Sequence, residues 1–311
     1  MPTPVAPFPI NAALIAAVVI AYANGAMIAD AVMPRVPVGQ DEFKYLVQNM
    51  ADQFTIQDTK VGRKSAPNQV EQNGDMVTAS VVEYGLDEVV PVADLRNAPE
   101  GVDPLAIAAE YVMKLVTLDR EVRVAGTVFN PANHVNKVTL AGTSQWSDYT
   151  SSDPISAIQT ALDVPIMRPN VMTIGRLAWT KLRLHPKVID YINGKGGTTG
   201  GVTRQQLADA LELQEILVGD SFVNTARRGQ AASIQRTWGK HAAFIYREKP
   251  TETSRSTTWG FTAESGPRVS NAKFGEDFGG LDGGYKVRAG ERLREVVSAP
   301  DLSYFFQNVV A

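Results

Sequence analysis

The three histidines are the first residues to examine for chemistry, because an imidazole can bind a metal ion or transfer a proton near neutral pH. They are His134, His185 and His241. They form neither an i,i+4 pair nor an HExxH motif, so a metal or acid–base role would require a coincidence in the folded chain. We expect all three to be structural.

The glycine-rich segment Gly194–Gly201, with the sequence GKGGTTGG, could be taken for a phosphate-binding loop. It lacks the order G-x-x-x-x-G-K-[ST], and Thr199 stands where the motif G-x-G-x-x-G needs its third glycine. It also follows a predicted helix, whereas a phosphate loop follows a strand. We expect a flexible surface loop here.

Nucleophilic chemistry finds no support either. The chain has no cysteine, which excludes a thiolate nucleophile, a disulfide and a zinc or iron–sulfur site built on cysteine. It contains no G-x-S-x-G elbow. We therefore predict no catalytic, cofactor-binding or metal-binding residues, no cofactor, and a protein that is not an enzyme.

Charged residues gather in the polar segment Asp58–Asp75, where Lys60, Arg63, Lys64 and Glu71 are the candidate contact residues. The basic side chains could touch DNA, but the mixed signs favour pairing between proteins, since complementary charges fix the register of an interface. A solvated loop would explain any single one of these residues equally well.

Composition limits the function further. Of 311 residues, 44% are apolar, so the chain can bury a substantial core. With 30 basic and 33 acidic residues the net charge is -3, which argues against a dedicated binder of phosphate backbones. We expect any contact with nucleic acid to be weak and local.

An apolar run at Asn11–Ala26 is the first element that the sequence predicts. No basic residue precedes Arg35, and the run is too short to cross a bilayer as a helix, which argues against a targeting or membrane segment. We predict a buried or partner-facing amphipathic helix. Pro34 and Pro37 then favour an extended exit from it.

Alternation of apolar and polar residues dominates Phe43–Val92. Phe54 and Ile56 alternate with polar neighbours, as do the apolar residues between 77 and 81. This pattern predicts a long hairpin with a polar tip at residues 58–75. Because a hairpin is marginally stable alone in water, we expect it to lie on a neighbouring subunit.

Two Asp-Pro pairs predict helix starts, with Asp as the cap and Pro at the first helical position. The pair at Asp103 begins a long helix to about Val124, and the pair at Asp153 begins a shorter one. The long helix has ion pairs outside, Glu110 with Lys114 and Asp119 with Arg123, and a predicted buried face made of Leu105, Ala108, Val112, Leu115 and Val122.

From Val164 onward, strands and helices alternate, which indicates α/β character. A strand at residues 171–174 precedes a helix through Ala178 and Leu182, and a further helix at residues 203–211 precedes strands at 215–218 and 242–246. The last part, from Thr257 to Ala311, is predicted to be strands with glycine-rich turns.

The order of these parts resembles the major capsid proteins of tailed phages, and the resemblance runs through nearly the whole chain. The segments that carry it are Ala21–Val38 (AYANGAMIADAVMPRVPV), similar to an N-terminal arm; Gly62–Glu71 (GRKSAPNQVE), similar to an extended-loop tip; Leu95–Val124, similar to a spine helix; Gln145–Ile158, similar to a turn into the peripheral domain; Pro169–Val188, similar to the start of an axial domain; and Trp238-Gly239, before an axial strand.

The resemblance implies an α+β fold of the Hong Kong 97 type. The predicted parts are residues 1–42 as an N-terminal arm, 43–94 as an extended-loop hairpin, 95–163 as a peripheral domain with the spine helix, 164–250 as an α/β axial domain, and 251–311 as a return to the peripheral domain. The implied function is self-assembly of hexamers and pentamers into an icosahedral shell around double-stranded DNA.

The same resemblance implies partners and a location. The partners would be further copies of the chain, portal and scaffolding proteins, decoration proteins as a further candidate, and packaged DNA held by weak, non-specific contact; no membrane is implied. The arm begins within the first dozen residues, which implies a separate scaffolding protein or none. The protein would be made in the bacterial host cytoplasm and would reside in the virion capsid.

Two alternatives stay open at this point. An encapsulin-type nanocompartment has the same fold but encloses a cargo enzyme, and gene context would separate it from a phage shell. A soluble α/β enzyme that uses residues 194–201 as a ligand loop would bind a nucleotide saturably. The sequence favours the phage shell protein.

Overall fold

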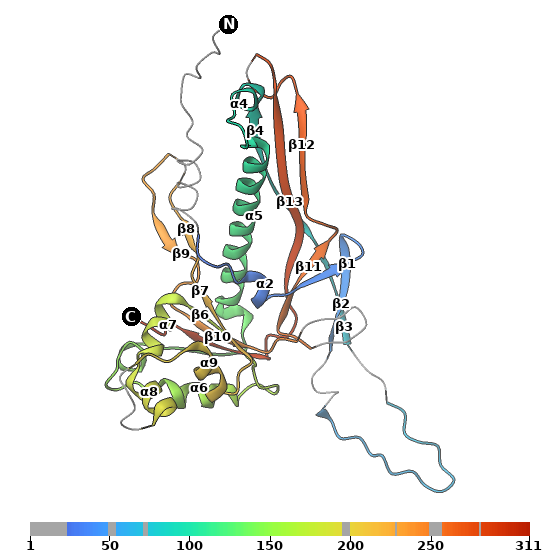
Figure 1. Cartoon of the computed structure of the whole chain (residues 1–311). Helices are drawn as coiled ribbons and strands as arrows, with labels where there is room; N and C mark the ends of the chain where they lie inside the picture. Colours follow the sequence, from blue (N-terminus) through green and yellow to red (C-terminus); the bar gives the residue numbers. More distant parts are fainter. Residues whose placement is uncertain are drawn as a thin grey trace.

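The structure is a computed structural model. The residues that it describes are 24–48, 54–70, 74–194, 200–227, 229–248, 257–279 and 281–311. Figure 1 shows an elongated upper part with a long helix and long strands, a rounder lower part in which short helices surround a sheet, and a loop that projects away from both.

Helices are few and mostly short. They are α2 (Ala29–Val32), α4 (Val92–Arg96), α5 (Pro104–Val128), α6 (Pro154–Leu162), α7 (Arg176–Arg183), α8 (Pro186–Asn193) and α9 (Arg204–Ala210), with 3-10 turns at Pro131–Asn133 and Gly142–Ser144. Both predicted Asp caps are confirmed: Asp103 accepts a hydrogen bond from the backbone N–H of Leu105 at 2.9 Å, and Asp153 accepts one from Ser156 at 3.2 Å.

Strands occur in both the upper and the lower part. They are β1 (Arg35–Val38), β2 (Glu42–Gln48), β3 (Gly74–Ser80), β4 (Val82–Pro91), β5 (Asn136–Thr139), β6 (Val171–Gly175), β7 (Glu215–Gly219), β8 (Phe222–Asn224), β9 (Ile234–Arg236), β10 (Ala242–Ile245), β11 (Gly260–Ser265), β12 (Val269–Gly275), β13 (Gly284–Val297) and β14 (Ser303–Gln307).

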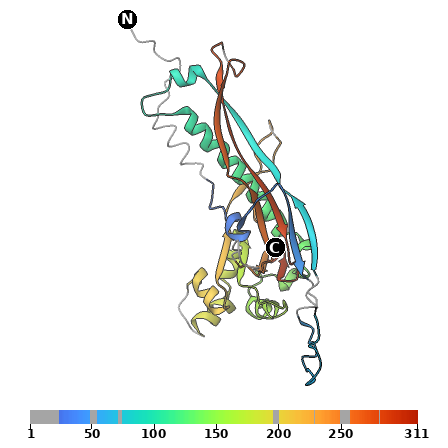
Figure 2. The same ribbon diagram turned by 90° about the vertical axis from the view of Figure 1, so that its right-hand side faces the viewer.

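The upper sheet is organised around β13. This strand pairs antiparallel with β4 along one edge. Along its other edge, its first half pairs antiparallel with β12 and its second half with β11, and β1 pairs with β11 in parallel. Helix α5 packs along β13 and β4, as Figure 2 shows from the side. Ala108, with Val90 and Val287 from these strands, forms the small apolar core between the helix and the sheet.

The lower part holds the main core. Its sheet has the order β5-β14-β10-β6-β7, with β6 and β7 parallel. Helices α6 to α9 bury Leu162, Leu182 and Leu207 against it, together with Trp146 and Trp179. The predicted α/β character of the segment from residue 164 is therefore confirmed.

The hairpin differs from the prediction. Its strands are β2 and β3, paired antiparallel from Glu42 opposite Ser80 to Gln48 opposite Gly74. The predicted strand at Phe54 and Ile56 is wrong, because these residues lie in the projecting loop with 62% and 97% of their surface exposed. Alternation is a local pattern, and it does not by itself place a segment in a sheet.

Other predictions are also corrected. The strand after the hairpin, β4, pairs with β13 of the upper sheet, so the paired hairpin strands end at Ser80. On α5, Leu115 and Val122 are exposed rather than buried, since the face toward the sheet follows Ala108, Val112 and later residues at steps of four. Of the predicted N-terminal helix, residues 11–23 lie outside the described part, and residues 24–26 are not helical.

Candidate intersubunit surface

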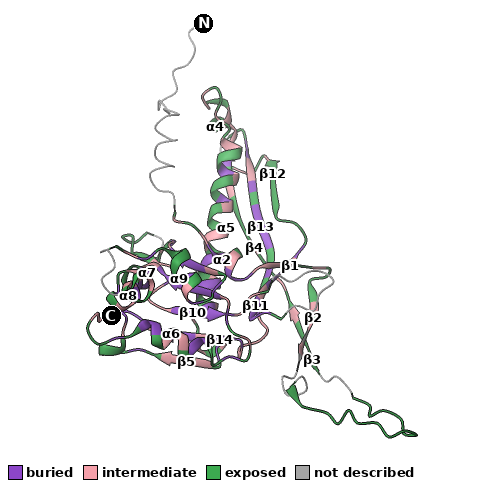
Figure 3. Cartoon of the chain, turned by 60° about the horizontal axis from the view of Figure 1, so that its bottom comes forward, coloured by how far each residue is buried: buried purple, intermediate pink, exposed green. Residues whose placement is uncertain are grey.

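The projecting loop consists of residues 54–70, and every one of its side chains is exposed (Figure 3). Local hydrogen bonds help to shape it. The backbone N–H of Lys60 and the side-chain amide of Asn68 both donate to Asp58, at 3.0 and 2.8 Å, and Ser65 N–H donates to the Gly62 carbonyl at 3.0 Å. Local bonds of this kind set the course of a loop without supplying a core beneath it.

Large apolar side chains are exposed along this loop. Phe54, Ile56, Val61 and Val70 have 62%, 97%, 46% and 68% of their surface exposed. Burying apolar surface gains about 25 cal/mol per Å², so covering these side chains would be favourable. Exposed apolar residues that cluster on one projecting element mark a surface for another protein.

Three of the four predicted contact residues fall on the same loop. Lys60, Arg63 and Lys64 are all exposed there, and Arg63 and Lys64 lie in a turn. Glu71 lies outside the described residues. The described part of the loop thus combines a basic cluster with exposed apolar side chains.

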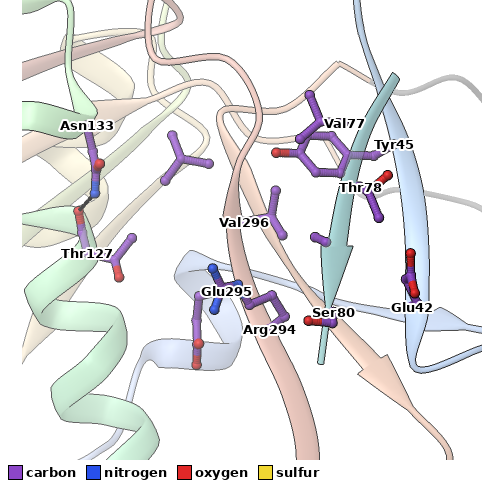
Figure 4. A pocket seen from close by; sticks show the side chains of 12 residues that line it. Glu42, Tyr45, Val77, Thr78, Ser80, Thr127, Asn133, Arg294, Glu295 and Val296 are labelled. Carbon is purple, nitrogen blue, oxygen red and sulfur yellow. Dashed lines mark hydrogen bonds between the residues drawn. The ribbon is translucent and has the colours of Figure 1, made fainter. Parts of the chain in front are cut away.

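An open cleft of about 670 Å³ lies at the root of the hairpin. Figure 4 shows Tyr45 and Val77 on its hairpin side, Thr127 and Asn133 near the end of α5, and Arg294 with its neighbours on β13. It is the place where the hairpin departs from the body. The Tyr45 ring meets Phe261 edge to face, with ring centroids 6.1 Å apart, and so ties the hairpin to the upper sheet.

Two adjacent charged residues of α5 were missed by the sequence analysis. Glu121 is fully buried and accepts hydrogen bonds from the backbone N–H groups of Ile28 and Ala29, at 2.9 and 2.8 Å. It also accepts from Trp238 Nε1 at 2.6 Å and from Ser221 Oγ at 3.4 Å. Its carboxylate therefore joins the start of α2, the spine helix and the lower part.

Arg120, its neighbour, is 1% exposed and pairs with Asp30 of α2. It also donates to the Met33 carbonyl at 3.3 Å and to Thr262 Oγ1 at 3.2 Å. Burial lowers the pKa of Arg120, an effect that the nearby carboxylates of Glu291 and Glu295 oppose. We call Glu121, Arg120 and Asp30 the arm anchor.

Arg35 extends the arm anchor into the upper sheet. Its guanidinium reaches the carboxylates of Asp30, Glu264 and Glu291 at 2.7, 2.8 and 2.9 Å. A sequence signal for the anchor does exist. Arg120 falls midway between Val116 and Val124 on the buried face of α5, and a charge at an apolar position of a helix indicates a buried partner.

The histidines have packing and capping roles. His134 is 2% exposed, lies 2.7 Å from the Val128 carbonyl and 2.8 Å from Ser303 Oγ, and stacks between two aromatic rings. Burial lowers its pKa to about 4, although the Val128 carbonyl acts in the opposite sense. His185 Nδ1 accepts from Lys187 N–H at 3.2 Å and caps α8, and His241 Nδ1 accepts from Asn308 N–H at 3.0 Å.

Two features are absent from the described residues: a metal-binding cluster and a membrane-spanning helix. Within those ranges, no three or more His, Asp or Glu side chains are grouped so that they could hold a metal ion. In the same part of the chain, no helix is both long and apolar enough to span a membrane. The surface with the clearest functional meaning is the projecting loop.

The arrangement of arm, projecting loop, spine helix and lower α/β part matches solved structures. A phage-related protein from Bordetella bronchiseptica has a TM-score of 0.70, with 96% of both chains covered at 21% identity. The capsid structure of cyanophage P-SCSP1u has a TM-score of 0.59 and covers 91% of this chain and 88% of the other at 10% identity. The fold is therefore the predicted α+β capsid fold of the Hong Kong 97 type.

Sequence similarity identifies the family. No protein-family model matches the chain. The major capsid protein of Pseudomonas phage JBD67 is 48% identical over 308 residues, which cover 98% of this chain and 99% of that protein. The chain belongs to the major capsid proteins of phages.

Proposed function

We propose that copies of this protein assemble as hexamers and pentamers into the icosahedral shell that encloses the double-stranded DNA of a tailed phage. As a phage major capsid protein, it is a structural component of the virion, and its assembly is homo-oligomeric. The observation that carries the proposal of a shell is the projecting loop. Its large apolar side chains are exposed to solvent, and packing against a neighbouring subunit would bury them.

The predicted division into parts is kept as a proposal. It assigns residues 1–42 to an N-terminal arm, 43–94 to the extended loop, 95–163 and 251–311 to the peripheral domain, and 164–250 to the axial domain. In this division the lower α/β part would point toward the hexamer or pentamer axis. The pairing of β1 with β11 supports treating the arm as an attachment to the peripheral domain.

The contact residues of the proposed interface are Lys60, Arg63, Lys64 and Glu71. Three of them are exposed on the loop, beside large apolar side chains. We propose that the apolar residues supply the affinity between subunits and that the charges fix the register, since exposed ion pairs contribute little free energy but select orientation.

Other partners belong to the proposal as well. Portal and scaffolding proteins, and decoration proteins as a further candidate, would bind the shell. A net charge of -3 favours weak, non-specific contact with the packaged DNA. The protein would be made in the bacterial host cytoplasm and would carry out no catalysis, because the functional surfaces are contacts.

The experiment is negative-stain electron microscopy of the purified protein, alone and together with the products of its neighbouring genes. We expect closed particles of uniform size or capsomer rings. A stable monomer under all conditions would contradict the proposal. Particles that hold a cargo enzyme instead of DNA would favour the encapsulin-type nanocompartment. That alternative has the same fold, but the similarity to a phage major capsid protein does not support it.

A matched pair of variants tests the loop charges. The triple variant Lys60→Glu, Arg63→Glu, Lys64→Glu reverses the basic cluster, whereas Lys60→Arg, Arg63→Lys, Lys64→Arg keeps the charge. We expect shells from the second variant and misassembled or no particles from the first. Equal yields of closed shells from both would show that these charges do not set the register.

A further inference from the structure

Helix α5 has a second apolar face. Ile107, Tyr111, Leu115 and Val122 are 41%, 55%, 37% and 37% exposed, and their spacing of four, four and seven residues puts them on one side of the helix. We call these four residues the α5 stripe. The stripe is separate from the buried face that contacts the upper sheet.

Polar residues border the α5 stripe. Glu110 pairs with Lys114 at 2.6 Å along one edge, and Asp119 pairs with Arg123 along the other. A helix that is apolar on two faces is normally covered on both. An apolar surface with a polar rim is typical of a binding site.

We propose that residues 11–23 of the same chain pack on the α5 stripe. Their sequence, NAALIAAVVIAYA, separates large side chains from small ones at helical spacing. One face would carry the large residues Leu14, Ile15, Val18, Val19 and Tyr22. The other would be mostly alanine, with Ile20 as the exception.

The first described residues lie near α5, as this packing requires. Asn24 makes two hydrogen bonds to the backbone of Phe222, at 2.9 and 2.8 Å. Four residues later, the N–H of Ile28 binds Glu121 on α5 at 2.9 Å. Four residues span at most about 14 Å, so Asn24, the first described residue, lies within that distance of Ile28, which binds the second half of α5.

The length and the charge of the N-terminal segment also fit the α5 stripe. From Ile107 to Val122, α5 rises about 22 Å, and a helix of 13 residues would rise about 20 Å. Residues 1–23 contain no charged side chain, so packing them on the stripe would bury no unpaired charge. A segment of the same chain also has a high local concentration, which favours it over a free partner.

Disulfide trapping tests the proposal cleanly, because the chain has no cysteine of its own. Leu115→Cys is combined in turn with Leu14→Cys, Ile15→Cys, Val18→Cys and Val19→Cys in the full-length protein. We expect at least one pair to lose most of its free thiols under mild oxidation, while the product still runs as a single chain on a non-reducing gel.

Two controls make the result specific. Ala13→Cys and Ala16→Cys, on the opposite helical face, should trap several-fold less with Leu115→Cys. Ile56→Cys on the projecting loop should not trap Val18→Cys within one chain. Cross-linked dimers in place of the single-chain product would assign the segment to a neighbouring subunit and overturn the proposal, as would the absence of any trapping.

A deletion gives a second measurement that does not depend on cysteine geometry. Removing residues 1–23 should expose the α5 stripe and raise the fluorescence of a bound apolar dye several-fold. Adding Tyr111→Gln and Leu115→Gln to the deletion should remove most of that increase. An unchanged signal after the deletion would contradict the proposal, whether or not the protein still assembles.

Discussion

Glu121 connects the arm, the spine helix and the lower part of the molecule. Its carboxylate accepts two backbone N–H groups of the arm and the Trp238 indole N–H. In Glu121→Gln, the amide NH₂ group would face these donors and leave at least one of them unpaired. We expect the free energy of unfolding to fall by about 2–4 kcal/mol, measured by urea denaturation.

The control is Glu110→Gln, which changes the same residue type on the same helix. Glu110 is exposed, and its pair with Lys114 is worth about 0.5 kcal/mol or less. Limited proteolysis adds a local readout, because Glu121→Gln should release the arm near Ile28 for cleavage. Similar losses of stability in the two variants would argue against the arm anchor.

His134 makes a pH dependence predictable. Burial lowers its pKa to about 4 in the folded protein. In the unfolded chain the pKa is about 6.5, so the unfolded state binds more protons between these values. The contribution of neutral His134 to the free energy of unfolding is therefore fully present above pH ~6.5. It is lost as the pH falls toward ~4, a decrease of about 3 kcal/mol in total.

Urea denaturation at several pH values between 4 and 7 measures this effect, with His134→Gln as the comparison. The variant should be less stable at pH 7 but should lose less stability on acidification. Burial also lowers the pKa of His185 and His241. Because the wild-type protein and the His134→Gln variant both contain these two residues, their contribution to the pH dependence cancels in the comparison. Parallel curves would show that His134 does not titrate as described.

At the scale of elements, the projecting loop is separable from the folded body. Replacing residues 56–70 with a short Gly-Ser linker should leave the hairpin strands β2 and β3 able to pair. We expect a change in melting temperature of less than about 3 °C, because little buried surface is lost. Electron microscopy should show capsomers or monomers instead of closed shells.

The counterpart to this deletion is a change in the lower part of the subunit. Ile158→Ala removes a fully buried side chain from α6 and should destabilise the subunit by about 2–5 kcal/mol. The deletion thus affects assembly and the substitution affects folding. Intact shells from the loop deletion would contradict the assigned role of the loop.

Local signals in the sequence explain which elements could be predicted. The caps at Asp103 and Asp153 act on backbone N–H groups within three residues, so both helix starts were readable. The parallel pairing of Arg35–Val38 with β11 joins residues more than two hundred positions apart and has no local signature. For the same reason the strand partner of residues 74–80 was misplaced.

The candidate surface was predictable in part. The polarity of the segment around Lys60 and Arg63 indicated a loop that its own subunit does not bury, and the described residues are indeed exposed. The Glu121 part of the arm anchor was not predictable, because a Glu on a helix is usually on the surface, whereas Arg120 at an apolar position of α5 did indicate a buried partner. Only the contacts of Glu121 in the folded chain reveal its role.

At the scale of the whole molecule, assembly should be visible by hydrogen exchange. The backbone amides of residues 54–70 should exchange rapidly in unassembled capsomers, since the loop is exposed and has few hydrogen bonds. We expect slower exchange, by tenfold or more, after shells form. Amides of β6 and β10 in the lower sheet serve as the reference and should not change.

Because α5 and β13 pack side by side, the upper part of the subunit should resist bending. The helix is about 37 Å long and the strand about 46 Å. Bending such a pair would have to stretch one member and compress the other. Strain on an assembled shell would therefore be taken up where this pair ends, above all at Val81, the residue between hairpin strand β3 and β4.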